Sequence, residues 1–117
     1  MLITFCKSKI QGVRITAKEL DYEGSITIAK ELLKAADILP NEKVQVVNFN
    51  NGMRLETYVI LGQENSGVCL NGPAARLGEI KDKIIIISYA LFDKKEIVDF
   101  KPKIVYVDAE NKITQVK

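Results

Sequence analysis

The chain contains no histidine and no tryptophan among its 117 residues. Without histidine, the Ser-His-Asp and Cys-His catalytic arrangements, a histidine general base and every histidine metal site are excluded. Aromatic residues make up 7% of the sequence, so aliphatic side chains must fill the core. Any chemistry that this chain performs must depend on other groups.

An excess of one charge and long apolar runs are also lacking. The 17 basic and 15 acidic residues give a net charge of +2, and no basic cluster with interleaved aromatic residues occurs. The longest apolar run, Ile84–Ile87, is far shorter than the ~20 residues of a membrane span, and the N-terminus does not resemble a signal peptide. We therefore expect a cytoplasmic protein with neither a nucleic-acid partner nor a membrane partner.

The two cysteines, Cys6 and Cys69, stand far apart and form no CxxC motif. Neither has acidic neighbours at the spacing of metal ligands. Two reduced, buried thiols are the favoured interpretation, with a disulfide or a nucleophilic cysteine as alternatives. We expect no metal site.

Short β-strands dominate the pattern of the sequence, and its length fits a single domain spanning residues 1–117. Alternating or continuous β-branched segments, typical of strands, recur along the chain. We expect strands at 13–16, 44–46, 53–61, 83–89, 104–107 and 113–116. Asn50-Asn51-Gly52 predicts a hairpin, because Asn and Gly readily adopt positive φ angles.

Helices are few. Apolar residues spaced along 28–36 predict one helix, with Thr27 as its N-cap, and a short helical turn is expected after Pro73. Many short strands with one or two short helices indicate a mainly β fold, closed or nearly closed into a barrel.

Gly24-Ser25, placed between an expected strand and helix, is by itself an ordinary turn. Together with other short motifs in the same order, however, it resembles the pyruvoyl-dependent aspartate 1-decarboxylase family over residues 2–116. The motifs are Ser-Lys-Ile (8–10), Tyr-x-Gly-Ser-Ile-Thr-Ile (22–28), Asn-Glu-Lys-Val (41–44), Asn-Asn-Gly-x-Arg-x-x-Thr-Tyr (50–58), Leu-Asn-Gly-x-Ala-Ala-Arg (70–76) and Ile-Ile-Ile-Ser-Tyr (85–89).

The resemblance implies a double-psi β-barrel that assembles into a homotetramer, with active sites between neighbouring subunits. It also implies that the chain cuts itself between Gly24 and Ser25, giving a β chain, 1–24, and an α chain, 25–117. The Ser25 hydroxyl would attack the Gly24 carbonyl, and the new N-terminus would become a pyruvoyl group, the cofactor. The Gly24 backbone suits this step, since glycine allows close approach and unusual angles.

The implied activity converts L-aspartate to β-alanine and carbon dioxide through a Schiff base on the pyruvoyl group, for pantothenate biosynthesis. By the same resemblance, Tyr58 is the proton donor and Thr57 assists the self-processing of Gly24 and Ser25. The implied substrate-binding residues are Lys9, Arg54, Thr57, Asn71, Gly72, Pro73 and Ala74. Pro73 stands where the family commonly has alanine, and it lacks an N–H that could contact substrate.

Strand geometry raises a difficulty for this site. Arg54 and Tyr58 fall on one face of their strand and Thr57 on the other, and about 13 Å separates the first two at roughly 3.3 Å per residue. Either a bulge redirects one of these side chains, or residues from two subunits meet. A plainer interpretation of Arg54 is a solvated residue paired with Glu56 or Glu64.

Two other functions remain open. One is a non-catalytic β-barrel module that binds a ligand or partner and keeps the bond between Gly24 and Ser25 intact. The other is a pyruvoyl enzyme that decarboxylates a different amino acid. The mass of the denatured chain distinguishes the first from a decarboxylase, and substrate profiling distinguishes the second.

Overall fold

A computed structural model describes all residues, 1–117, as nine strands and three short helices. In chain order the elements are β1 (Leu2–Arg14), β2 (Ala17–Glu19), β3 (Ser25–Ile28), α1 (Lys30–Ala36), β4 (Lys43–Asn48), β5 (Arg54–Leu61), β6 (Val68–Asn71), the 3₁₀ helix η1 (Gly72–Leu77), β7 (Lys83–Asp93), α2 (Lys94–Ile97), β8 (Lys103–Val107) and β9 (Ile113–Val116). None of the helices has the length and apolar character needed to cross a membrane.

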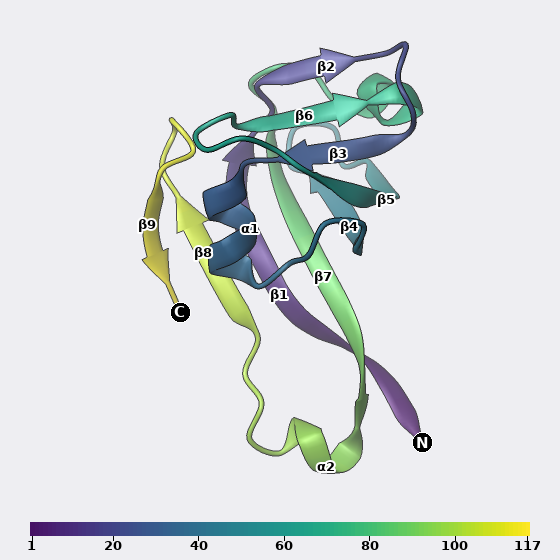
Figure 1. Cartoon of the computed structure of the whole chain (residues 1–117), viewed down its shortest axis with the longest axis vertical. Coiled ribbons are helices and arrows are strands. Elements are labelled where there is room, and N and C mark those ends of the chain that lie inside the picture. Colours follow the sequence, from purple (N-terminus) through teal and green to yellow (C-terminus); the bar gives the residue numbers. More distant parts are fainter.

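The strands form one continuous mixed sheet in the order β2-β6-β3-β5-β4-β7-β1-β8-β9. Three of its pairs, β1–β8, β2–β6 and β3–β5, are parallel, and the others are antiparallel. Figure 1 shows β2, β6 and β3 running across the top of the molecule, over the upper ends of β1 and β7. The sheet therefore bends over itself through β5 and β4 and encloses the core, which confirms the mainly β, barrel-like fold.

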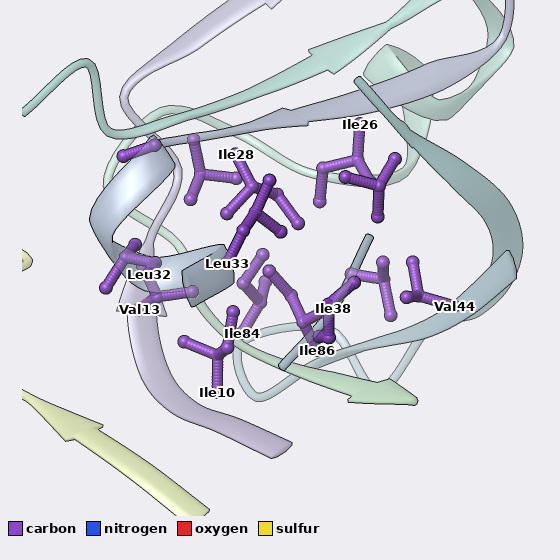
Figure 2. Close-up of a cluster of buried hydrophobic side chains, with 14 of the residues drawn as sticks. Ile10, Val13, Ile26, Ile28, Leu32, Leu33, Ile38, Val44, Ile84 and Ile86 are labelled. Carbon is purple, nitrogen blue, oxygen red and sulfur yellow. The ribbon is translucent and has the colours of Figure 1, made fainter. Parts of the chain in front are cut away.

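The core is a cluster of 20 buried aliphatic residues without any aromatic member, as the composition requires. Side chains from α1, β1, β3 and β7 meet in this cluster (Figure 2). Leu32 and Leu33 of α1 are buried there, and the helix packs against β1 and β8. The helix thus contributes to the core from outside the sheet.

Most of the expected strands are present. β4, β5, β8 and β9 agree closely with the predicted segments, and β7 extends beyond its predicted end to Asp93. The hairpin signal is confirmed, because β4 and β5 pair antiparallel across the turn and Gly52 has φ +73°. The strand expected at 13–16 overlaps β1 only at residues 13 and 14, because β1 spans Leu2–Arg14 and residues 15 and 16 lie outside any strand. A helical turn follows Pro73, as predicted, in the form of η1.

The prediction for the start of α1 is wrong. The helix begins at Lys30, its N-cap is Ala29, and no side chain caps it. Thr27 and Ile28 instead belong to β3, which pairs with β5 on one side and β6 on the other. Hydrogen bonding on both sides keeps this segment extended, so pairing within the sheet outweighs the local helical pattern.

β1 and β7 continue past the barrel as a two-stranded extension toward the N-terminus and α2, at the bottom of Figure 1. Three phenylalanines pack on it, with ring centroids 4.6–6.1 Å apart: Phe5, Phe92 and Phe100. Three of the aromatic residues missing from the core therefore pack together here. The capping box of Asp93 and Glu96 fixes the start of α2 at the end of β7.

Candidate active site

The bond between Gly24 and Ser25 lies where an exposed turn enters the sheet. Gly24 is exposed, whereas Ser25 is the first residue of β3 and is fully buried. Ser25 stands opposite Asn71 of β6, and the next residue, Ile26, pairs with Val59 of β5. The backbone on the Ser25 side is therefore held by the sheet, while the Gly24 side remains open.

Two hydrogen bonds fix the Ser25 hydroxyl. It donates its proton to the backbone carbonyl of Glu23 at 3.1 Å. It also accepts a hydrogen bond from the side-chain amide Nδ2 of Asn71 at 3.0 Å. One lone pair of the oxygen stays outside these two contacts.

Asn71 is itself held from two further sides. Its Nδ2 donates to the Thr27 hydroxyl at 2.9 Å, and the Cys69 thiol donates to its Oδ1 at 3.2 Å. Ser25 and Thr27 alternate along β3, as Cys69 and Asn71 do along β6, so all four side chains share one face of the pair. Every polar atom of the Asn71 amide is thereby satisfied.

An open pocket of about 410 Å³ lies beside Gly24. Its lining comes from Gly24, from β5 and from η1: Leu55, Glu56, Thr57, Tyr58, Pro73, Ala74 and Leu77. Consecutive β5 residues reach one pocket because β3 pairs with β5 only from Val59 onward. The preceding stretch of β5 pairs with β4 alone and keeps a free edge beside Gly24.

Gly72 brings η1 against the segment before Ser25. Its φ is +63°, and a Cβ there would lie 2.4 Å from the Tyr22 carbonyl oxygen and 2.8 Å from the Gly24 nitrogen. Any side chain would push this segment away. The position therefore requires glycine both for its positive φ and for the close approach of the two backbones. The Gly72 backbone thus supports the turn that carries Gly24.

The hydroxyls of Thr57 and Tyr58 make no hydrogen bond within the chain, and both half-buried residues line the pocket. Neither oxygen is a buried, unsatisfied atom. Both groups are accordingly available to a reacting group or a substrate beside Gly24.

Arg54 and Lys9 do not line this pocket. Arg54 is exposed at the start of β5 and donates from Nη1 to the Gln45 side-chain oxygen at 3.0 Å, which also accepts from the Tyr89 hydroxyl at 2.8 Å. It pairs with neither Glu56 nor Glu64, since Glu56 forms its ion pair with Lys43.

Lys9 is half-buried on β1, opposite Ile87 of β7 and Ile104 of β8. β5 keeps an unbroken register with both of its neighbours, so no bulge brings Arg54 toward Gly24. Within one chain, the structure gathers Gly24, Ser25, Thr57, Tyr58 and the 71–74 segment, but not the two cations.

The sequence analysis missed the contacts of Thr27 and Cys69 with Asn71. Polar residues at alternate positions, Ser25 with Thr27 and Cys69 with Asn71, were the available signal, but its use requires knowing that β3 pairs with β6. Both cysteines are free, as expected, but they are half-buried rather than fully buried. Burial raises the pKa of the Cys69 thiol, and the nearby charge of Glu19 raises it further.

Comparisons with known proteins give one consistent result along nearly the whole chain. The family model described as "Aspartate decarboxylase" matches residues 1–114. A protein named aspartate 1-decarboxylase from Acetivibrio thermocellus is 58% identical, with 100% of this chain and 94% of the relative covered. Proteins of the same name from Carboxydothermus hydrogenoformans (57%; 100% and 93% covered) and Campylobacter jejuni (56%; 99% and 92% covered) are also similar.

Proposed function

The chain belongs to the aspartate decarboxylase family, and we propose on that premise that it converts L-aspartate to β-alanine and carbon dioxide. The observation that carries this proposal is similarity at 56–58% identity over 99–100% of the chain to relatives named for that activity. The enzyme would be a carboxy-lyase that supplies β-alanine for pantothenate biosynthesis. A non-catalytic barrel module has no comparable support.

We propose further that the chain is a precursor that cuts itself between Gly24 and Ser25. The Ser25 oxygen bonds to the Gly24 carbonyl carbon, the C–N bond breaks, and the nitrogen takes the hydroxyl proton, leaving an ester. Loss of the Ser25 Cα proton and cleavage of the bond between Ser25 Cβ and the ester oxygen then release Gly24 as a carboxylate and leave a Cα=Cβ double bond at residue 25. One water enters and ammonia leaves as the pyruvoyl ketone forms on residue 25, so the products are residues 1–24 and 25–117.

Several observations support this self-processing. The Ser25 hydroxyl is buried and held by two hydrogen bonds, whereas Gly24 is exposed beside a pocket. The Gly72 backbone lies so close to residues 22–24 that a Cβ would not fit. A fixed nucleophile beside a glycine carbonyl is the arrangement that an intramolecular attack requires.

The same residues fit a pyruvoyl group at position 25. Asn71, directly opposite, would face it, with Gly72 and Ala74 close by, whereas Pro73 contributes no N–H. Such a ketone supplies a sink for the electrons that remain when a carboxylate leaves as carbon dioxide.

Two side chains at the pocket would supply the remaining steps of proton transfer and self-cleavage. Tyr58 would give a proton to the substrate Cα after the carboxylate has left, since it lines the pocket beside Gly24 and its hydroxyl has no hydrogen bond within the chain. Thr57, on the same edge of β5, would donate to the Gly24 carbonyl during self-cleavage. These roles need no side chain other than those already at the pocket.

Substrate binding requires positive charge, and the pocket of one chain has none among its lining residues. We propose that Arg54 and Lys9 reach the pocket of a neighbouring subunit in a homotetramer, with active sites between subunits. The unbroken register of β5 supports this arrangement over a bulge. Arg54 would bind a carboxylate through its planar pair of N–H groups.

A cytoplasmic location is part of the proposal. Both cysteines are free thiols, as is usual in a reducing compartment.

Substrate profiling tests the activity. Purified protein is incubated separately with L-aspartate, L-asparagine, L-glutamate and other amino acids, and carbon dioxide and amine products are measured. Carbon dioxide and β-alanine from aspartate alone are expected. Preferred turnover of another amino acid would identify a related pyruvoyl enzyme instead, and no turnover of any would contradict the proposed function.

A further inference from the structure

We propose that Cys69 and Thr27 are positioning residues for self-cleavage, because together they hold the Asn71 amide with its Nδ2 directed at the Ser25 hydroxyl. The inference rests on the self-processing proposed above and adds the means by which the nucleophile is oriented. The sequence analysis assigned other roles to these two residues, a buried thiol for Cys69 and a helix N-cap for Thr27. Their contacts across β3 and β6 indicate this different one.

An asparagine amide has a donor end and an acceptor end, and a half-turn exchanges them. At Asn71 the donor end faces two hydroxyl oxygens, Ser25 Oγ at 3.0 Å and Thr27 Oγ1 at 2.9 Å. The acceptor end faces the Cys69 sulfur at 3.2 Å. A thiol donates a proton and accepts only weakly, so Cys69 favours the orientation that leaves Nδ2 facing Ser25.

The orientation of the amide matters for attack by Ser25. As the hydroxyl loses its proton, negative charge develops on the oxygen, and an N–H directed at that oxygen stabilises it. With the amide reversed, the Asn71 oxygen would instead bind the Ser25 proton and oppose its loss. The hydroxyl would also be drawn away from its present acceptor, the Glu23 carbonyl.

The environment of Cys69 suits a donor. Burial, with the charge of Glu19 nearby, raises the pKa of the thiol, so it keeps its proton at neutral pH. Asn71 is 3% exposed, so water cannot readily replace a lost partner. Thr27 stands directly opposite Cys69 in the register of β3 and β6, which places the four side chains on one face.

The second cysteine provides a matched control. Cys6 is also free and half-buried, but the one hydrogen bond of its sulfur is to the backbone carbonyl of Ser8, at 3.9 Å. Loss of that thiol leaves the Ser25 surroundings unchanged. Any general effect of replacing a half-buried cysteine should therefore occur in both variants.

The test measures the rate at which freshly made chain cuts itself. Wild type, Cys69→Ala, Cys69→Ser, Thr27→Val and the control Cys6→Ala are synthesised in a cell-free system. Samples are denatured at intervals, and mass spectrometry gives the ratio of intact chain to fragment 25–117. Midpoints of thermal unfolding are compared in the Ser25→Ala background, which keeps every chain intact.

Loss of one hydrogen bond at the buried amide should slow cleavage by roughly threefold to tenfold in Cys69→Ala and Thr27→Val. Cys69→Ser, which keeps a donor, should restore most of the rate, and Cys6→Ala should cleave as wild type does. This pattern would identify hydrogen-bond donation by residue 69 as the cause, because a purely structural role of the thiol predicts that serine does not restore the cleavage rate.

Two outcomes overturn the inference while leaving the proposed function intact. One is cleavage of Cys69→Ala and Thr27→Val at the wild-type rate. The other is a Cys69→Ser variant as slow as Cys69→Ala, which would indicate packing rather than hydrogen bonding. Wild-type chain that never yields fragment 25–117 overturns the proposed self-processing and this inference together.

Discussion

The side-chain amide of Asn71 donates a hydrogen bond to the Ser25 hydroxyl at 3.0 Å, and so joins the end of β6 to the first residue of β3. The next residue, Gly72, lies against the backbone of residues 22–24. One short segment therefore both contacts the proposed nucleophile and supports the turn that carries Gly24. This relationship shows how a serine without any histidine nearby can be held in place for the attack that we propose on its own backbone.

Thr57→Val should slow self-cleavage. Valine keeps the shape of threonine but removes the hydroxyl that we assign to the Gly24 carbonyl, at the pocket that both residues line. The measurement is the ratio of intact chain to fragment 25–117 over time. A variant that cleaves itself and turns over substrate at wild-type rates would contradict the role of Thr57 in self-cleavage.

Tyr58→Phe should separate maturation from turnover. The ring remains at the pocket and the chain should still cut itself, because that step does not use the Tyr58 proton. Formation of β-alanine should fall by about 10²–10⁴-fold, the usual contribution of general acid catalysis. An unchanged steady-state rate would mean that water or another group supplies the proton.

Arg54→Ala should reduce kcat/KM for aspartate by roughly 10²–10³-fold if a neighbouring subunit covers the Arg54–carboxylate pair, since an unpaired buried charge is costly. Asparagine, nearly the same shape but neutral, should be a poor substrate of the wild type. Lys9→Ala should do less, because water and salt partly replace a lysine. Equal turnover of aspartate and asparagine would contradict recognition by charge.

Glu42 should make stability depend on pH. Burial alone would raise the pKa of its carboxyl, but hydrogen bonds from Ser88, the Leu39 amide and Lys7 outweigh burial and lower it below 4.5. Since the folded state binds the proton less tightly, this stabilisation is present above pH 4.5 and is lost as the pH falls through the folded pKa.

Glu42→Gln should therefore lower the free energy of unfolding at neutral pH by about 1–3 kcal/mol, and the loss should shrink in acid. Urea denaturation at several pH values, in the Ser25→Ala background, measures this. If the free energies of unfolding of the variant and its parent differ by the same amount at every pH, Glu42 is not the source of the pH dependence.

The fold was largely predictable because its strands follow local patterns. The β-branched run of β7 and the Asn-Asn-Gly turn before β5 carry their own signals. β3 does not, since its last residues fit a helix equally well and only pairing with β5 and β6 decides between them. α2 was missed although its capping box is visible in the sequence, with Asp93 three residues before Glu96.

The site was less predictable than the fold. Gly24 and Ser25 stood out only through the resemblance of several motifs in order, because a Gly-Ser pair is common in turns. The pocket exists because β3 begins pairing with β5 at Val59, a register that no local pattern encodes. The bonds from Asn71 to Thr27 and Cys69 likewise depend on the β3–β6 register.

The intact mass of the denatured protein tests the central claim most directly. We predict two species, residues 1–24 and residues 25–117, the second carrying a ketone in place of its N-terminal amine. The Ser25→Ala variant should give one uncut chain without decarboxylase activity, because alanine has no hydroxyl to attack Gly24. An uncut wild-type chain that still converts aspartate to β-alanine, or a Ser25→Ala chain that still yields fragment 25–117, would contradict the account.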